Sequence, residues 1–159
     1  MKRYAGWWSR VGAALFDLLV ISIPAGVLAI VLFGSASAAF SADDDFGVAT
    51  LVVGLIAYVG LLVVALIFYA PLLMRRAGAR NGQTWGKQLA GIRVVRTNGV
   101  PMDFTHSAIR EVLVKGLGLG IASSMVPLLP YLLDALWPLW DDEHRAIHDM
   151  VVGTRVVEA

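Results

Sequence analysis

The sequence predicts an all-α integral membrane protein, in which three to four transmembrane or re-entrant helices carry a small cytoplasmic β element. Composition is the first reason: 58% of the 159 residues are hydrophobic and only 16% are charged, whereas soluble domains average roughly 25% charged residues. The second reason is that the apolar residues form long continuous runs. A soluble fold of this size could not bury so much apolar surface, but a bilayer solvates it. We expect one membrane domain, residues 1–159.

The first two helices are expected at residues 11–33 and 46–74. Each run is long enough to cross, because a span needs about 20 residues at about 1.5 Å of rise per residue. The first run is broken only by Asp17, and the second contains no charged residue. Cleavage of residues 1–38 as a signal peptide is an alternative, although this apolar run is longer than that of a signal and contains a carboxylate.

The third apolar stretch, residues 112–140, is interrupted by charges, glycines and prolines. We expect a hairpin in which residues 112–126 enter the membrane, Pro127–Pro130 turn, and residues 131–140 return. Both arms are short for complete spans, so a partly re-entrant pair is one alternative and a single crossing is another. Irregular backbone at membrane depth is tolerated only where protein or a water-filled cavity covers it.

The distribution of Lys and Arg predicts the orientation, since these residues accumulate on the cytoplasmic side. Three lie in the N-terminal segment, seven lie in the loop at residues 75–111, and none lies in the connection at residues 34–45. That connection instead contains Asp43, Asp44 and Asp45. We therefore expect a multi-pass protein of the cell membrane, with its N-terminus and loop in the cytoplasm and the acidic connection outside.

The tail, residues 141–159, is also expected on the cytoplasmic side. The loop segment Gly91–Val95 (GIRVV) is echoed in the tail by Gly153–Val157 (GTRVV), and both patterns indicate short β-strands. Two strands can pair only when they lie on the same side of a membrane. The echo thus predicts a β element shared by loop and tail, and it favours the hairpin over a single crossing.

Asp17 is the main candidate for a functional charge, because an ionised carboxylate within a span is costly unless it is paired. Arg10 precedes it by seven residues, so the two side chains share a helix face to within about 20° and lie about 10 Å apart along the axis. A water, a cation or a third side chain such as Arg110 or Lys115 could fill the gap. Two interpretations stay open: an ion pair that fixes helix packing, or a proton or ion site.

Two further carboxylates are candidates. Asp134, in the last apolar segment, can pair with Lys115 across the hairpin, approach the Asp17 site, or simply be hydrated. Asp149 precedes the predicted tail strand and can cap a turn or pair with an arginine of the loop.

No cofactor or metal is expected. The absence of cysteine excludes disulfides and thiolate metal sites. His144 and His148 have a spacing that could bind zinc on a helix, but no third ligand is assured, and a structural role is expected. Residues 82–88 differ from a phosphate-binding loop in their glycine spacing and in Gln88, which stands where a magnesium-binding hydroxyl belongs. No nucleophile is placed beside a base, so no enzyme is expected, and a net charge of +1 indicates no nucleic-acid partner.

Three segments resemble the RDD family of membrane proteins, and together they extend over nearly the whole chain. They are Tyr4–Asp17 (YAGWWSRVGAALFD), Gly82–Val95 (GQTWGKQLAGIRVV) and Arg145–Val157 (RAIHDMVVGTRVV). The family is named for one Arg and two Asp, and the resemblance implies that these are Arg10, Asp17 and Asp149. Trp85 and Gln88 depart from residues common in the family, and neither belongs to the charged triplet.

The resemblance implies a function only broadly, since transport, including cation/proton exchange, has been suggested for some members while others look like accessory parts of membrane complexes. The first hypothesis is therefore transport of a cation, a proton or a small solute, using Asp17 with Arg10 and Asp134. The alternative is a non-catalytic accessory or scaffold subunit that packs its charge-free second helix against other membrane helices. Three or four spans enclose little volume, so we expect a homo-oligomer or a larger membrane complex in the bilayer.

Overall fold

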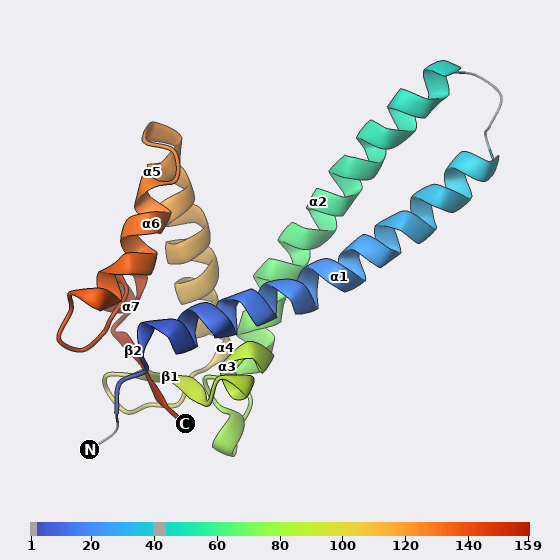
Figure 1. Cartoon of the computed structure of the whole chain (residues 1–159). Coiled ribbons are helices and arrows are strands. Elements are labelled where there is room, and N and C mark those ends of the chain that lie inside the picture. Colours follow the sequence, from blue (N-terminus) through green and yellow to red (C-terminus); the bar gives the residue numbers. More distant parts are fainter. Residues whose placement is uncertain (1–2, 40–43) are drawn as a thin grey trace. The chain divides into compact units, whose positions relative to one another are not determined.

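The computed structural model describes the backbone of residues 3–39 and 44–159, and the side chains of these residues outside 32–51. Two long helices come first, α1 (Trp7–Ala39) and α2 (Asp44–Met74). Shorter elements follow in the order η1 (Gly78–Arg80), α3 (Trp85–Leu89), β1 (Ile92–Arg96), α4 (Phe104–Ala108), η2 (Ile109–Gly118), α5 (Leu119–Met125), α6 (Leu129–Leu136), η3 (Trp137–Leu139), α7 (Ile147–Val152) and β2 (Thr154–Glu158) (Figure 1).

The chain divides into two compact units. One, here called the main unit, joins the N-terminal residues up to Asp17 to residues Ile67–Ala159. The other contains Leu18–Leu66, the remaining parts of α1 and α2. Every site described below lies within the main unit.

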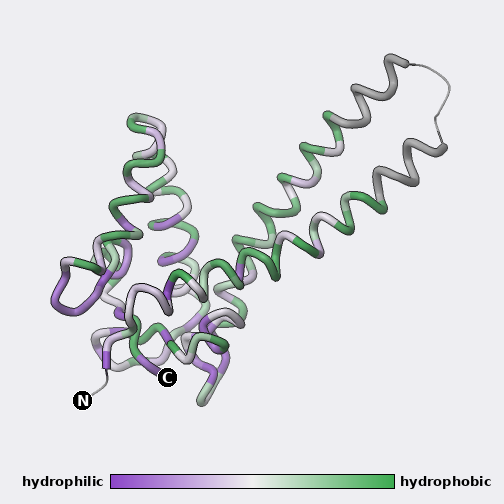
Figure 2. The backbone as a smooth tube through the Cα atoms, in the orientation of Figure 1, coloured by the Kyte–Doolittle hydropathy of each residue, from purple (hydrophilic) through white to green (hydrophobic). Residues whose placement is uncertain are grey.

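The prediction of two long apolar helices is confirmed. Trp7–Val31 and Val52–Met74 have mean hydropathies of 2.4 and 2.7, and within an apolar 18-residue window of each only 6% and 0% of the residues are buried. They are thus long and apolar enough to cross a membrane, and hydrophobic residues dominate their described parts in Figure 2. Both helices extend beyond the predicted ranges, because backbone hydrogen bonding continues past the point where the apolar run ends. Asp43, in the predicted acidic connection, lies outside the described residues.

The third apolar stretch forms the predicted chain reversal. The π-helix η2 continues into α5, the chain turns at Val126–Leu128, and α6 runs back beside α5 (Figure 1). The turn is shorter than predicted, since Pro130 already lies in the first turn of α6, where a proline's missing N–H costs nothing. With seven and eight residues, α5 and α6 are each shorter than the about 20 residues that a full span needs.

Loop and tail form the predicted β pair. β1 and β2 are antiparallel, with Ile92 opposite Glu158 and Arg96 opposite Thr154. The strands begin one residue later than predicted, because Gly91 and Gly153 have φ values of 64° and 65°, outside the extended region. The N-terminal segment joins the same ribbon through a bridge between Tyr4 and Val157.

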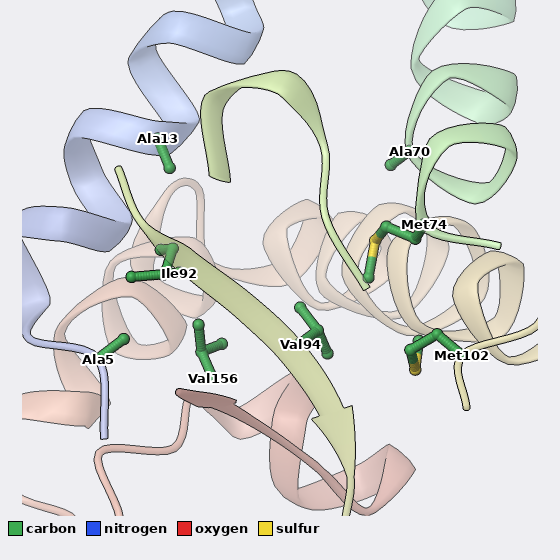
Figure 3. Close-up of a cluster of buried hydrophobic side chains, with 8 residues drawn as sticks. All are labelled: Ala5, Ala13, Ala70, Met74, Ile92, Val94, Met102 and Val156. Carbon is green, nitrogen blue, oxygen red and sulfur yellow. The ribbon is translucent and has the colours of Figure 1, made fainter. Parts of the chain in front are cut away.

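The core of the main unit lies around β1, as Figure 3 shows. It gathers side chains from the N-terminal segment, α1, α2, the loop and both strands: Ala5, Ala13, Ala70, Met74, Ile92, Val94, Met102 and Val156. Gly82 fastens the loop to this core, donating its N–H to the Met74 carbonyl at 2.9 Å and accepting from the Val94 N–H at 2.9 Å. A side chain at Gly82 would collide with the Val94 carbonyl, and its φ of 74° also favours glycine.

Candidate functional site

A buried carboxylate joins the first helix, the loop and the tail. Asp149 of α7 is 0% exposed, and it accepts hydrogen bonds from Arg110 at 2.6 and 3.0 Å and from Arg10 at 3.0 Å. The Thr154 hydroxyl donates at 3.0 Å and the Ala146 backbone N–H at 3.3 Å. Asp149 stands in the first turn of α7, where a carboxylate satisfies free N–H groups of the helix terminus. The expected turn cap and the expected pairing with a loop arginine are both present.

The electrostatics keep this cluster ionised. Burial by itself raises the pKa of the Asp149 carboxyl, but the charges of Arg110, His148 and Arg10 outweigh it and lower that pKa well below its ordinary value. Burial likewise lowers the pKa of Arg110, and the charges of Asp149 and Glu111 more than reverse this effect. The cluster is therefore a buried ion-pair network that connects the first helix, the loop and the tail.

Asp17 has a different environment. Its carboxylate accepts hydrogen bonds from the Tyr69 hydroxyl at 2.7 Å, the Thr84 hydroxyl at 2.5 Å and the Gly86 backbone N–H at 2.7 Å. These donors are neutral, and in the described part of the chain Asp17 forms no ion pair. Gly86 is required here, because a β-carbon would collide with the Ala13 carbonyl and press on the Asp17 carboxylate.

The local sequence explains how the loop reaches Asp17. Thr84 is the N-cap of α3, and its hydroxyl accepts from the Lys87 N–H at 3.3 Å. The first turn of α3 therefore presents a hydroxyl and a free backbone N–H to the same carboxylate.

The ion pair between Arg10 and Asp17 considered above is wrong. Their shared helix face permits such a pair, but Arg10 binds Asp149, which lies 139 residues away in sequence, and Asp17 binds the loop. Each residue binds a group within direct hydrogen-bond distance, whereas a pair between Arg10 and Asp17 would need a bridging group across a gap of about 10 Å.

Asp134 binds His148, which was not among the three possibilities considered above. It is 4% exposed and accepts from the backbone N–H of His148 at 2.9 Å, while the ring Nδ1 lies 2.7 and 2.8 Å from its two oxygens. Lys115 instead lies 3.7 Å from Glu111. Burial, together with the charge of Arg110, lowers the pKa of His148. Asp134 and His148 thus fasten α6 to α7.

The two histidines do not form a helical zinc pair. His144 precedes α7 with a φ of 51°, and its Nδ1 lies 2.9 Å from the Pro138 carbonyl oxygen. Among the described side chains, which exclude those of residues 32–51, no group of three or more His, Asp or Glu is arranged to hold a metal.

Sequence reasoning missed a second group of enclosed charges. Glu111 contacts Arg110 and lies 4.0 Å from Lys87 and 3.7 Å from Lys115. Burial raises the pKa of Glu111, but the charges of Arg110, Lys115 and Lys87 bring it well below its ordinary value, whereas burial lowers the pKa of Lys87. The i, i+4 spacing of Glu111 and Lys115 was the available signal.

Neutral members of the site carried weaker signals. Tyr69 is one aromatic residue among many in an apolar helix, and no charge indicates that it donates to Asp17. Thr84 resembled an N-cap only by residue type. The arrangement as a whole contains one carboxylate fixed by two arginines, Asp149, and one held by neutral donors, Asp17.

Comparison with known proteins places these residues in context. The model of the RDD family matches residues 4–153. The chain is also 26% identical over 161 residues to "Uncharacterized protein YckC" of Bacillus subtilis (strain 168), covering 98% of this chain and 85% of that protein. No solved structure matches the chain.

Proposed function

The chain belongs to the RDD family, and on that premise we propose that it transports a proton or a small cation across the cell membrane, with Asp17 as the responsive group. One observation carries the proposal: Asp17 lies in an apolar helix, accepts three hydrogen bonds from neutral donors, and has no cationic partner among the described residues. No catalysed reaction is part of this proposal.

The contrast with Asp149 supports the choice of Asp17. The charge of Asp149 is compensated by two guanidinium groups. A carboxylate offers about four lone-pair sites, and Asp17 uses three, so a proton or a cation can occupy the fourth. The side chain is half-buried, so other protein atoms do not enclose it fully. An acidic side chain within an apolar, membrane-spanning helix is by default a candidate for a functional site.

A multi-pass topology fits the same proposal. The ribbon brings together β1 of the loop, β2 of the tail and Tyr4 of the N-terminal segment, and paired strands must lie on one side of a membrane. The N-terminal segment, the loop and the tail are rich in Lys and Arg, which favours the cytoplasmic side. The α5–α6 hairpin would then be re-entrant, covered by the rest of the protein. Because these helices enclose little volume, transport would require an oligomer.

The test is flux in proteoliposomes that contain a pH-sensitive dye, with imposed gradients of protons, Na⁺ and K⁺. Asp142→Asn is the matched control, because Asp142 is an exposed carboxylate. We expect flux with the wild type and the control, and none with Asp17→Asn, although all three elute as single species. Equal flux in the wild type and Asp17→Asn would remove the proposal.

The alternative is an accessory subunit of a larger membrane complex. The origin of the Asp17 contacts favours this alternative, because Tyr69 comes from α2 and Thr84 from the loop. A purely structural role, in which these bonds hold α1, α2 and the loop together, would explain the same contacts. Gentle detergent extraction followed by mass spectrometry distinguishes the two. A stoichiometric larger complex without flux supports the accessory role, and a homo-oligomer with flux supports transport.

A further inference from the structure

We propose that the main unit contains a binding site for a phosphate group, in a cavity separate from Asp17 and independent of the transport proposal. The cavity has a volume of about 930 Å³ and is formed by the N-terminal segment, the loop and the tail strand. Four arginines line it, Arg75, Arg93, Arg96 and Arg155, and no Asp or Glu is among its lining residues.

The β ribbon builds one wall of this cavity. Arg93 lies opposite Val157 and Arg155 opposite Val95. Directly opposed residues share a face, so the two arginines are diagonal neighbours, about 7 Å apart in an antiparallel pair. The opposite face of the ribbon packs into the core through Ile92, Val94 and Val156. The core thus fixes the backbone positions of two arginines on the outer face, where their positive charges together attract an anion.

The arginines are only partly compensated. Arg96 lies 3.3 Å from Asp103, and Arg155 lies 3.6 Å from Glu143. Over the described residues, Arg75 and Arg93 form no ion pair. Glu143 also lies 3.5 Å from Arg145, so the two acidic partners compensate at most two of the four lining arginines.

Arg155 is held at the cavity wall by Tyr4. One of its terminal nitrogens donates to the Tyr4 hydroxyl at 3.3 Å, and its Cζ lies 6.0 Å from the centre of the Tyr4 ring. Phosphate oxygens suit the terminal groups of the lining arginines, because guanidinium N–H groups bind them in parallel pairs.

Position in the chain suggests how the ligand arrives. Arg75 directly follows Met74, the last residue of an apolar stretch long enough to span a membrane, so one wall lies at the depth of lipid headgroups. Anionic headgroups attract basic residues at this depth. A soluble phosphate compound offers the same oxygens, and the experiment separates the two sources.

The full-length protein is purified in uncharged detergent and tested with two probes. Native mass spectrometry follows retention of phosphatidylglycerol against phosphatidylcholine, and titration calorimetry follows sodium pyrophosphate. The pocket variant is Arg93→Gln with Arg155→Gln. The control, Arg3→Gln with Arg80→Gln, removes the same charge at exposed positions outside the cavity. Arg75→Gln is a second pocket variant that removes no described ion pair.

Binding of either probe should weaken roughly tenfold for each pocket arginine removed, and by less than about twofold in the control. Preference for phosphatidylglycerol identifies a lipid headgroup, and binding of pyrophosphate alone identifies a soluble phosphate; both support the proposal. Binding that the control and the pocket variants weaken equally would reflect bulk charge and overturn it, as would no binding of either probe. If the double variant does not fold, Arg75→Gln decides by the same criterion.

Discussion

Replacing Asp149 with asparagine removes the carboxylate that lies between Arg10 and Arg110. The side chain keeps its size, and its amide oxygen can still accept a hydrogen bond, so the change acts mainly on charge. The carboxylate and both guanidinium groups are largely buried, since the side chains of Asp149, Arg110 and Arg10 are 0%, 3% and 14% exposed. Solvent therefore screens little of the loss.

The magnitude follows from leaving two cations in an enclosed site without their shared partner. Removing one member of a buried ion pair costs about 3–5 kcal/mol. Arg110 keeps its contact with Glu111, which places the expected loss toward the lower end. For a chain of this size, each kcal/mol corresponds to about 2–4 °C in the melting temperature, so Asp149→Asn should melt at least about 6 °C below the wild type.

The assay is thermal unfolding in detergent, read by tryptophan fluorescence, with Asp142→Asn as the control. Adding Arg10→Gln to Asp149→Asn should recover part of the loss, because one unpaired cation is then gone. A melting temperature for Asp149→Asn within about 2 °C of the control would refute the argument that this charge holds the three segments together.

Other expectations follow from the same contacts. Gly86→Ala should lower the free energy of unfolding by about 1–3 kcal/mol, because the added methyl group overpacks against α1, and its melting temperature should fall accordingly. Gly12 has open space around it, so Gly12→Ala should not lower the melting temperature. Tyr69→Phe deletes the 2.7 Å hydrogen bond to Asp17 and should cost about 1 kcal/mol, with an unchanged melting curve counting against that bond. The depressed pKa of Asp149 stabilises the fold above the ordinary carboxyl range, near pH 4, and this stability is lost as pH falls through the folded pKa. As the pH is lowered through the acid range, the melting temperature should therefore fall more steeply for the wild type than for Asp149→Asn. Equal slopes of melting temperature against pH would contradict this.

Local features made much of the fold predictable. Two long apolar runs predicted α1 and α2, because hydropathy and helix length depend only on residues close in sequence. The repeated Gly-x-Arg-Val-Val pattern predicted the pairing of β1 with β2. Pro127 and Pro130 predicted the chain reversal before α6, although they did not predict the π-helical form of η2.

The partners of the charged residues were predictable only in part. Asp149 was expected either to cap a turn or to pair with an arginine of the loop, and it does both. For Asp134 the sequence left open Lys115, the Asp17 site or hydration, whereas in the folded chain His148 reaches it through both its ring and its backbone. Spacing on one helix can rank neighbours on that helix, but it says nothing of a competitor brought in by another element.

The sequence by itself therefore determined the apolar helices, the shared β ribbon and the small group of charges worth testing, since each depends on composition or on a pattern of neighbouring residues. Only the tertiary structure decided that Arg10 binds Asp149 while Asp17 is held by Tyr69, Thr84 and the loop backbone. The physical reason is that these bonds join segments far apart in sequence, and that neutral donors carry no charge by which a sequence could mark them. Which carboxylate is bound by arginines and which by neutral donors is thus a property of the folded chain.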